Sequence, residues 1–189
     1  MRDEDARKRS VKKTSVKKTL EIFTIGHSNR TWTDFLKLLR AHRIQRVIDV
    51  RSIPRSRHNP QFARDTLPKK LRAARIAYVH LRQLGGRRRA TADSPNAGWR
   101  NASFRGYADY MQTAEFRAGL DRAIELAKRK RTVLMCAEAV PWRCHRSLIA
   151  DALLVRKIKV ADIIVGKTAR KHSLTKFAKV HGQRITYPL

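Results

Sequence analysis

Five short apolar runs alternate with helical patterns along this chain of 189 residues. Each run has the length and the side chains of a buried β-strand, and together they cover residues 22–25, 46–50, 76–79, 132–135 and 160–165. Strands separated by helical segments form βαβ units, in which the strands lie parallel. We therefore predict a single α/β domain of three layers, with a mostly parallel sheet of about five strands and helices on both faces.

The segments between the runs carry the signals of helices and loops. Trp32, Phe35 and Leu39 recur on one side of a helix, and Thr31 with Asp34 resembles a capping box at its start. Further helices are predicted around residues 67–74, 116–127 and 144–154, with one more short helix after Gly166. Arginine-rich loops are predicted over residues 51–61 and 87–101.

The positive charge of the chain is extreme. Lys and Arg number 44 against 15 Asp and Glu, which gives a formal net charge of +29. Residues 1–19 are predicted to be a disordered basic arm with a net charge of +5, so +24 remains on residues 20–189, the predicted α/β domain. Such a charge attracts polyanions. We expect nucleic acid or another phosphorylated ligand as the partner.

Several protein classes are disfavoured by the sequence. No apolar run approaches the roughly 18 residues that a membrane span needs. The N-terminus lacks the apolar core of a secretion signal, and two cysteines are too few for a disulfide framework. We therefore expect a cytoplasmic protein with no membrane partner. Nothing in the sequence indicates the oligomeric state.

Ionisable side chains follow four of the five predicted strands. They are His27 after the first strand, Asp49 and Arg51 at the second, His80 at the third, and Cys136 and Glu138 at the fourth. Because the carboxyl ends of parallel strands meet at one edge of a sheet, these side chains are predicted to share a pocket there. Any one of them alone is more typical of a structural hydrogen bond or a cap.

Several motifs resemble one known family. They are Thr24-Ile-Gly-His-Ser-Asn-Arg30, Asp49-Val-Arg-Ser-Ile-Pro-Arg-Ser-Arg57, Leu84-Gly-Gly86, Phe104-Arg-Gly-Tyr-Ala108, Met135-Cys-Ala-Glu138, Cys144-His-Arg146 and the final Tyr187-Pro188. In this order they are similar to the domain-of-unknown-function family numbered 488, over residues 21–189. The resemblance implies a compact α/β protein and no established activity. Its motif positions map onto His27, Asp49, Arg51, Cys136, Glu138, Cys144, His145 and Arg146.

Cys136 and Cys144 permit several kinds of chemistry. A thiolate at Cys144 would be stabilised by the helix that is predicted to begin there, and would act as a nucleophile. A phosphatase loop has five residues between its Cys and its Arg, whereas six residues separate Cys136 from Arg143, and Pro141 removes a backbone donor. This spacing disfavours a phosphatase. The two thiols could instead form a reversible disulfide, or simply pack in the core.

A divalent metal is a possible cofactor, although the sequence identifies none. Cys136, Cys144 and His145 are the candidate ligands, and His27 or Glu138 could join them. The seven residues between the two cysteines are not a zinc-finger spacing. The adjacency of Cys144 and His145 demands a special backbone if both are to face one ion.

Arginines near the predicted pocket favour a phosphorylated ligand, because guanidinium groups bind phosphate in a bidentate manner. The candidate phosphate-binding residues are Arg51, Arg55, Arg57, Arg143 and Arg146. Trp99, Phe104 and Tyr107 are candidates for stacking on bases, but such aromatics more often anchor a loop to the core.

The interpretation that best unites these features is an enzyme acting on nucleic acid or a nucleotide. The predicted catalytic residues are His27, Asp49, Cys136, Glu138, Cys144 and His145, with Asp49 or Glu138 as the general base and His27 as an acid or a metal ligand. Two alternatives stay open. One is a non-catalytic nucleic-acid-binding module, and the other is a thiol-based redox or sulfur-transfer protein.

Overall fold

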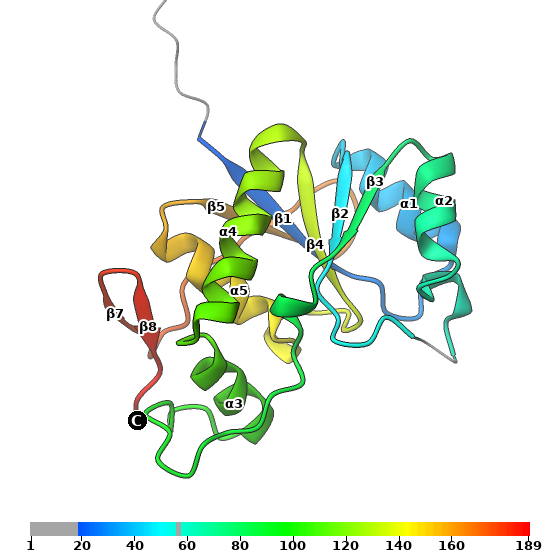
Figure 1. The fold of residues 1–189 in the computed structure, drawn as a ribbon. Coiled ribbons are helices and arrows are strands. Elements are labelled where there is room, and N and C mark those ends of the chain that lie inside the picture. The colour runs from blue at the N-terminus through cyan, green and yellow to red at the C-terminus, as the bar shows by residue number, and fades with distance from the viewer. Residues whose placement is uncertain (1–18, 56–57) are drawn as a thin grey trace, which may run out of the picture.

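A six-stranded sheet runs through the middle of the molecule (Figure 1). The computed structural model describes residues 19–55 and 58–189. The strands lie in the order β3-β2-β4-β1-β5-β6, and only β6 is antiparallel to its neighbour. Their bounds are β1 Glu21–Gly26, β2 Arg46–Asp49, β3 Ala77–His80, β4 Thr132–Cys136, β5 Lys159–Ile163 and β6 Arg170–Lys171.

Helices cover both faces of this sheet, which confirms the predicted three-layer α/β fold. Helices α1 and α2 lie on one side, and α4 and α5 lie on the other (Figure 1). The helices are α1 Trp32–Ala41, α2 Leu67–Ala73, α3 Ala102–Tyr110, α4 Ala114–Arg129 and α5 Arg146–Val155. Among the described residues, no helix is both long enough and apolar enough to cross a membrane.

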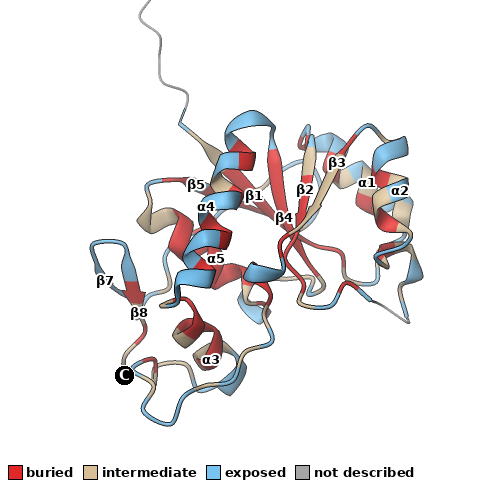
Figure 2. Cartoon of the chain, viewed as in Figure 1, coloured by how far each residue is buried: buried red, intermediate tan, exposed pale blue. Residues whose placement is uncertain are grey.

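The side chains of the central strands alternate between two hydrophobic cores, as the period of a strand requires. In β4, Val133 and Met135 pack in the core with α1 and α2, whereas Leu134 and Cys136 pack in the core with α4 and α5. All of β4 is buried, because helices cover both of its faces (Figure 2). A strand buried on both sides appears in the sequence as a continuous apolar run.

The C-terminal part of the chain corrects two expectations. No helix forms after Gly166 in the described residues; the segment contains β6 and a hairpin of β7 Lys179–His181 and β8 Arg184–Thr186. The turn of this hairpin includes Gly182, whose φ of 61° suits glycine. β6 adds a sixth strand to the sheet, where about five were expected, because it pairs with the edge of β5.

Two more differences concern helices. α3 occupies a segment for which no helix was predicted, and Asn101 caps it by accepting hydrogen bonds from two backbone N–H groups. α5 begins at Arg146 rather than at Cys144, since Cys144 has extended backbone angles. Thr31 does cap α1, as predicted, by accepting from the Asp34 N–H. The predicted basic arm lies outside the described residues except for Thr19.

The end of β1 lies unusually close to the loop that follows β4. The His27 N–H donates to the Cys136 carbonyl at 2.9 Å, and the Ser28 N–H donates to the Ala137 carbonyl at 2.8 Å. A Cβ atom on Gly26 would lie 1.6 Å from the carbonyl oxygen of Glu138. Only glycine therefore permits this approach, which joins the two strand ends that carry His27 and Cys136.

A buried polar network connects β1, β5 and α5 to the C-terminal segment. His172 lies between Asp151 and Asp162, with ring nitrogens 3.0 and 3.1 Å from their carboxylate oxygens. Thr24 donates to Asp162, and the Tyr187 hydroxyl donates to Asp151. Burial opposes a charge on His172, but the hydrogen bonds to the two carboxylates outweigh it and raise its pKa to about 9.

This network makes the stability of the fold depend on pH. The folded pKa of His172 exceeds its ordinary value of 6.5, so its stabilising effect is complete below pH 6.5 and disappears as the pH rises through 9. We expect the free energy of unfolding to fall over this range by on the order of 2 kcal/mol. Urea denaturation at several pH values measures this fall. In His172→Gln the fall should be absent, and an unchanged pH dependence in that variant would contradict the assignment.

Replacing Gly26 should disturb the junction of β1 and the β4 loop. We expect Gly26→Ala to lower the free energy of unfolding by about 1–3 kcal/mol or more, because its methyl group meets backbone atoms that cannot rotate away. Gly182→Ala is the control, since its Cβ meets nothing within 4 Å and carries only the cost of a positive φ. The explanation fails if Gly26→Ala is as stable as the wild type in thermal and urea denaturation.

Candidate functional site

A pocket of about 360 Å³ opens at the carboxyl edge of the sheet. Residues after β1, β2 and β4 line it, together with the loop after β3 and the start of α3. The lining residues are His27, Arg51, Ser52, Ile53, Arg55, Gly86, Arg87, Ser103, Phe104, Cys136, Ala137, Glu138, Arg143, Cys144 and His145. The parallel strands therefore bring together side chains that are far apart in the sequence.

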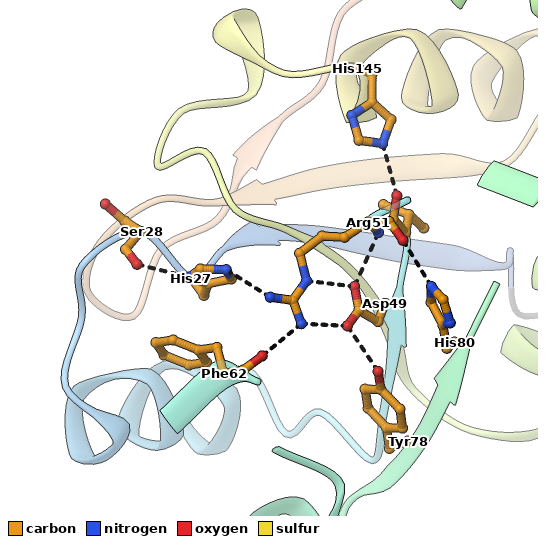
Figure 3. Close-up of polar contacts among 9 residues, drawn as sticks. His27, Ser28, Asp49, Arg51, Phe62, Tyr78, His80 and His145 are labelled. Carbon is orange, nitrogen blue, oxygen red and sulfur yellow. Dashed lines mark hydrogen bonds and ion pairs between the residues drawn. The ribbon is translucent and has the colours of Figure 1, made fainter. Parts of the chain in front are cut away.

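A buried ion pair stands beside the pocket. Arg51 and Asp49 are 6% and 0% exposed, and the Arg51 Nη2 lies 2.6 Å from the Asp49 Oδ2 (Figure 3). The Arg51 Nε and backbone N–H donate to the other carboxylate oxygen, and the Tyr78 hydroxyl donates to Oδ2. Arg51 also donates to the Phe62 carbonyl at 2.8 Å. Four hydrogen bonds to Asp49 leave its carboxylate saturated.

His27 is held in one tautomer by its neighbours. Its Nδ1 lies 2.8 Å from the Ser28 carbonyl oxygen, which can only accept, so Nδ1 carries the proton. Its Nε2 lies 3.1 Å from Arg51 Nη1 and accepts from it. Burial lowers the pKa of His27 to about 4, and the charge of Arg51 contributes. The ring is therefore neutral near pH 7, and it stacks on Phe62 with centroids 4.4 Å apart.

Two thiols and an imidazole form the floor of the pocket. The Nδ1 of His145 lies 3.8 Å from the Cys136 sulfur and 3.7 Å from the Cys144 sulfur. Its Nε2 donates to the Val50 carbonyl at 3.0 Å (Figure 3). Nδ1 is therefore the nitrogen that faces the two sulfurs. Both cysteines are free and nearly completely buried, at 6% and 3% exposure.

The two thiols have opposite tendencies to ionise. The hydrogen bond to Cys144 and burial raise the pKa of Cys136 well above its usual value. Burial also acts to raise the pKa of Cys144, but its hydrogen bonds with Cys136 and His145, together with the charge of Arg146, outweigh burial and lower that pKa well below the usual value. Cys144 is therefore the more readily ionised thiol of the pair.

The backbone before α5 permits the adjacent Cys144 and His145 to point the same way. Pro141–Arg143 form a single 3-10 turn, after which Cys144 is extended with φ −140° and ψ 141°. His145 then takes helical angles, φ −55° and ψ −18°, and occupies the N-cap position of α5 without a side-chain capping hydrogen bond. This change from extended to helical backbone brings the sulfur of one residue and Nδ1 of the next within 3.7 Å.

Arginines form the rim of the pocket. Arg55, Arg87 and Arg143 are exposed, and no described residue holds their guanidinium groups by a hydrogen bond or ion pair. Arg146 differs, because it is 1% exposed and donates to the carbonyl oxygens of Glu138 and Ala139 at 2.6 and 3.0 Å. It fixes the loop rather than lining the pocket. Arg57, a predicted phosphate ligand, lies outside the described residues.

Most of the predicted site residues that the structure describes meet in this pocket. Asp49 and Arg146 are the exceptions, since both lie outside the lining. The saturated carboxylate of Asp49 and the carbonyl contacts of Arg146 suit them to positioning other groups, in place of the predicted base and phosphate-binding roles. His80 also supports the loop, by donating to the Arg51 carbonyl at 2.8 Å.

Sequence reasoning missed Ser52, Ser103 and Gly86 as lining residues. The pair Gly85-Gly86 was the available signal, because a Cβ on Gly86 would lie 2.3 Å from His145 Nδ1. Of the aromatics considered for stacking, only Phe104 lines the pocket. Tyr107 is fully buried, and Trp99 packs against Phe104, Phe177 and Tyr187, as an anchor of its loop would.

Comparisons with known proteins place the chain in a family but not in a reaction class. Neither the curated proteins nor the solved structures contain a match to this sequence. One family model matches residues 31–153, which include most of the pocket lining and both cysteines but not His27. This match covers well over half of the chain, so the chain belongs to the family described as Domain of unknown function DUF488.

Proposed function

We propose that this protein is an enzyme that acts on a nucleotide unit, either free or within a single-stranded nucleic acid. The single observation that carries the proposal is the pocket itself. Unpaired arginines surround a floor of two thiols and an imidazole, and Glu138 is the one carboxylate in the described lining. A phosphate bound by the rim arginines would place the rest of the nucleotide next to the two thiols and the imidazole.

The charge of the pocket selects anions. Arg55, Arg87 and Arg143 offer fork-shaped donors that match phosphate oxygens, and no described carboxylate forms an ion pair with them. Arg51 retains one N–H at Nη1 beyond those used by Asp49, Phe62 and His27. The net charge of +29 would also raise the local concentration of polyanions near the pocket.

The size of the pocket favours a single nucleotide over a duplex. A volume of about 360 Å³ lies at the lower end of the range for small-ligand sites, about 300–1,000 Å³. Phe104 in the lining offers an aromatic face to a base, and Ser52 and Ser103 offer hydroxyl groups. A base of a double helix would have to leave its stack to reach the thiols.

Roles within the pocket follow from which groups are free. Glu138 is exposed and lines the pocket, so it is the carboxylate suited to accept a proton. Cys136, Cys144 and His145 supply the reactive floor. Arg51 and Ser28 engage both ring nitrogens of His27, and Arg51 and Tyr78 engage the carboxylate of Asp49, so His27 and Asp49 orient the Arg51 guanidinium and do not exchange protons with the ligand.

Loss of a rim arginine should weaken nucleotide binding. We expect Arg55→Gln and Arg143→Gln each to raise the Kd for a nucleotide by about tenfold, since a hydrogen bond to a charged group contributes about 1.5–3 kcal/mol. Calorimetric titration measures this Kd. Titrations with nucleoside monophosphates and with short single strands show whether the pocket binds a free nucleotide or a nucleotide within a nucleic acid. Arg122→Gln is the matched control, because Arg122 is exposed on α4, beside Arg46 at the opposite edge of the sheet. Equal losses in all three variants would contradict the assignment of the rim.

Turnover separates an enzyme from a binding module. Among the products of nucleotides or single strands incubated with the full chain, we expect at least one that Cys144→Ser and Glu138→Gln form about 10² times more slowly. Both variants should still bind the ligand. Strongly salt-dependent binding without any turnover, unaffected by either substitution, would overturn the proposal and favour the non-catalytic module.

A further inference from the structure

We propose that Cys136, Cys144 and His145 bind one zinc ion, with the fourth coordination position open to the pocket. The three ligand atoms lie within 4.8 Å of one another, and all three residues line the pocket. Only the catalytic role of that ion rests on the proposed function. The binding of the metal itself follows from the geometry of the three residues.

The separations of the ligand atoms are close to those of a tetrahedral zinc site. With Zn–S of about 2.3 Å and Zn–N of about 2.0 Å, sulfur and nitrogen ligands lie roughly 3.5 Å apart. The His145 Nδ1 lies 3.8 Å from one sulfur and 3.7 Å from the other. Shifts of a few tenths of an ångström would therefore give both N–S separations of a zinc site, and the two sulfurs lie within 4.8 Å of each other.

The imidazole already has the tautomer that a metal requires. Nε2 of His145 donates to the Val50 carbonyl at 3.0 Å, so Nδ1 is the ring nitrogen left to bind a metal, and it faces the two sulfurs. Metal-binding histidines usually make such a second hydrogen bond, because it fixes the ring and increases its basicity. The ring also packs on Tyr107, with centroids 4.9 Å apart.

The surroundings hold these ligands in place before any ion binds. Gly86 leaves room for the imidazole, since a Cβ there would lie 2.3 Å from Nδ1. Cys136 ends β4, a strand buried along its whole length, and Cys144 begins the turn into α5. A site built on a strand end and a helix start is rigid, which lowers the entropy cost of coordination.

The chemistry of the ligands identifies the class of ion. Two thiolates and an imidazole are soft or borderline donors, which favour zinc over magnesium or calcium. Two thiolates also cancel the charge of a divalent ion. Three protein ligands with a fourth position open are typical of catalytic zinc, where water or a substrate atom completes the tetrahedron. The pocket provides the access that such a ligand needs.

Metal analysis and cobalt spectroscopy test the proposal on the full, untagged chain. We expect about one equivalent of zinc in protein purified with a reductant and without chelator. After its removal, Co²⁺ alone should produce the thiolate charge-transfer absorption of a tetrahedral site. The sequence contains only two cysteines, so this band reports on Cys136 and Cys144. Absence of zinc together with absence of the cobalt band in folded, reduced protein would overturn the proposal.

A pair of histidine variants provides a matched control. His145 and His80 each donate Nε2–H to a neighbouring carbonyl of the same loop, of Val50 and of Arg51 respectively. We expect His145→Gln to weaken Co²⁺ binding by at least about 100-fold, and His80→Gln to leave it within a few-fold. Gly86→Ala should also weaken it, because its methyl group displaces the imidazole. Equal affinities in all three variants would overturn the assignment of His145.

The outcome is separable from that of the proposed function. Zinc binding without nucleotide binding would leave the metal site intact and overturn the nucleotide proposal alone. Nucleotide turnover in protein that binds neither zinc nor cobalt would overturn the zinc site and leave the nucleotide proposal intact. A disulfide between Cys136 and Cys144 in freshly purified protein, with no metal retained after its reduction, would favour the redox alternative and overturn the zinc site.

Discussion

The ion pair of Asp49 and Arg51 is the interaction on which the arrangement of the pocket depends. A charge buried in a protein is tolerated only when it is paired and its hydrogen bonds are satisfied. Asp49 meets this condition through Arg51 and Tyr78, and Arg51 meets it through Asp49, Phe62 and His27. The ends of β1 and β2, the turn around Phe62 and β3 are thereby held together. Removing either charge would leave the other uncompensated, at a cost of about 3–5 kcal/mol.

Most of the sheet could be predicted from the sequence because four of its strands, β1, β2, β4 and β5, are largely buried. Five of its six strands correspond to apolar runs, and helix packing on each side explains why those runs do not alternate with polar residues. β6 could not be found in this way. It has two residues, both exposed and basic, and it forms only because β5 offers an unpaired edge. Helix α3 was missed because Gly106 and few long aliphatic residues weaken its pattern.

The position of the site could be predicted, but the state of its residues could not. Parallel strands force their carboxyl ends to one edge, so His27, Arg51 and Cys136 had to lie near one another. Whether a side chain is free or saturated depends on partners distant in the sequence. The Phe62 carbonyl on Arg51 and the Glu138 carbonyl on Arg146 are backbone groups, and no sequence pattern identifies them. Hydrogen bonds to such backbone groups decide how many N–H donors Arg51 and Arg146 retain for a ligand.

The charges in the pocket connect the two proposals. A phosphate held by Arg55 and Arg143 would lie in the same small pocket as two thiols, and thiolates there would repel it. Without a metal, the pKa of Cys136 is raised and that of Cys144 is lowered, so ionisation of the pair favours a single negative charge on Cys144, which the charge of Arg146 helps to stabilise. A zinc ion would permit both sulfurs to ionise while cancelling their charge. The floor would then be neutral, so the positive rim would determine the charge of the ligand.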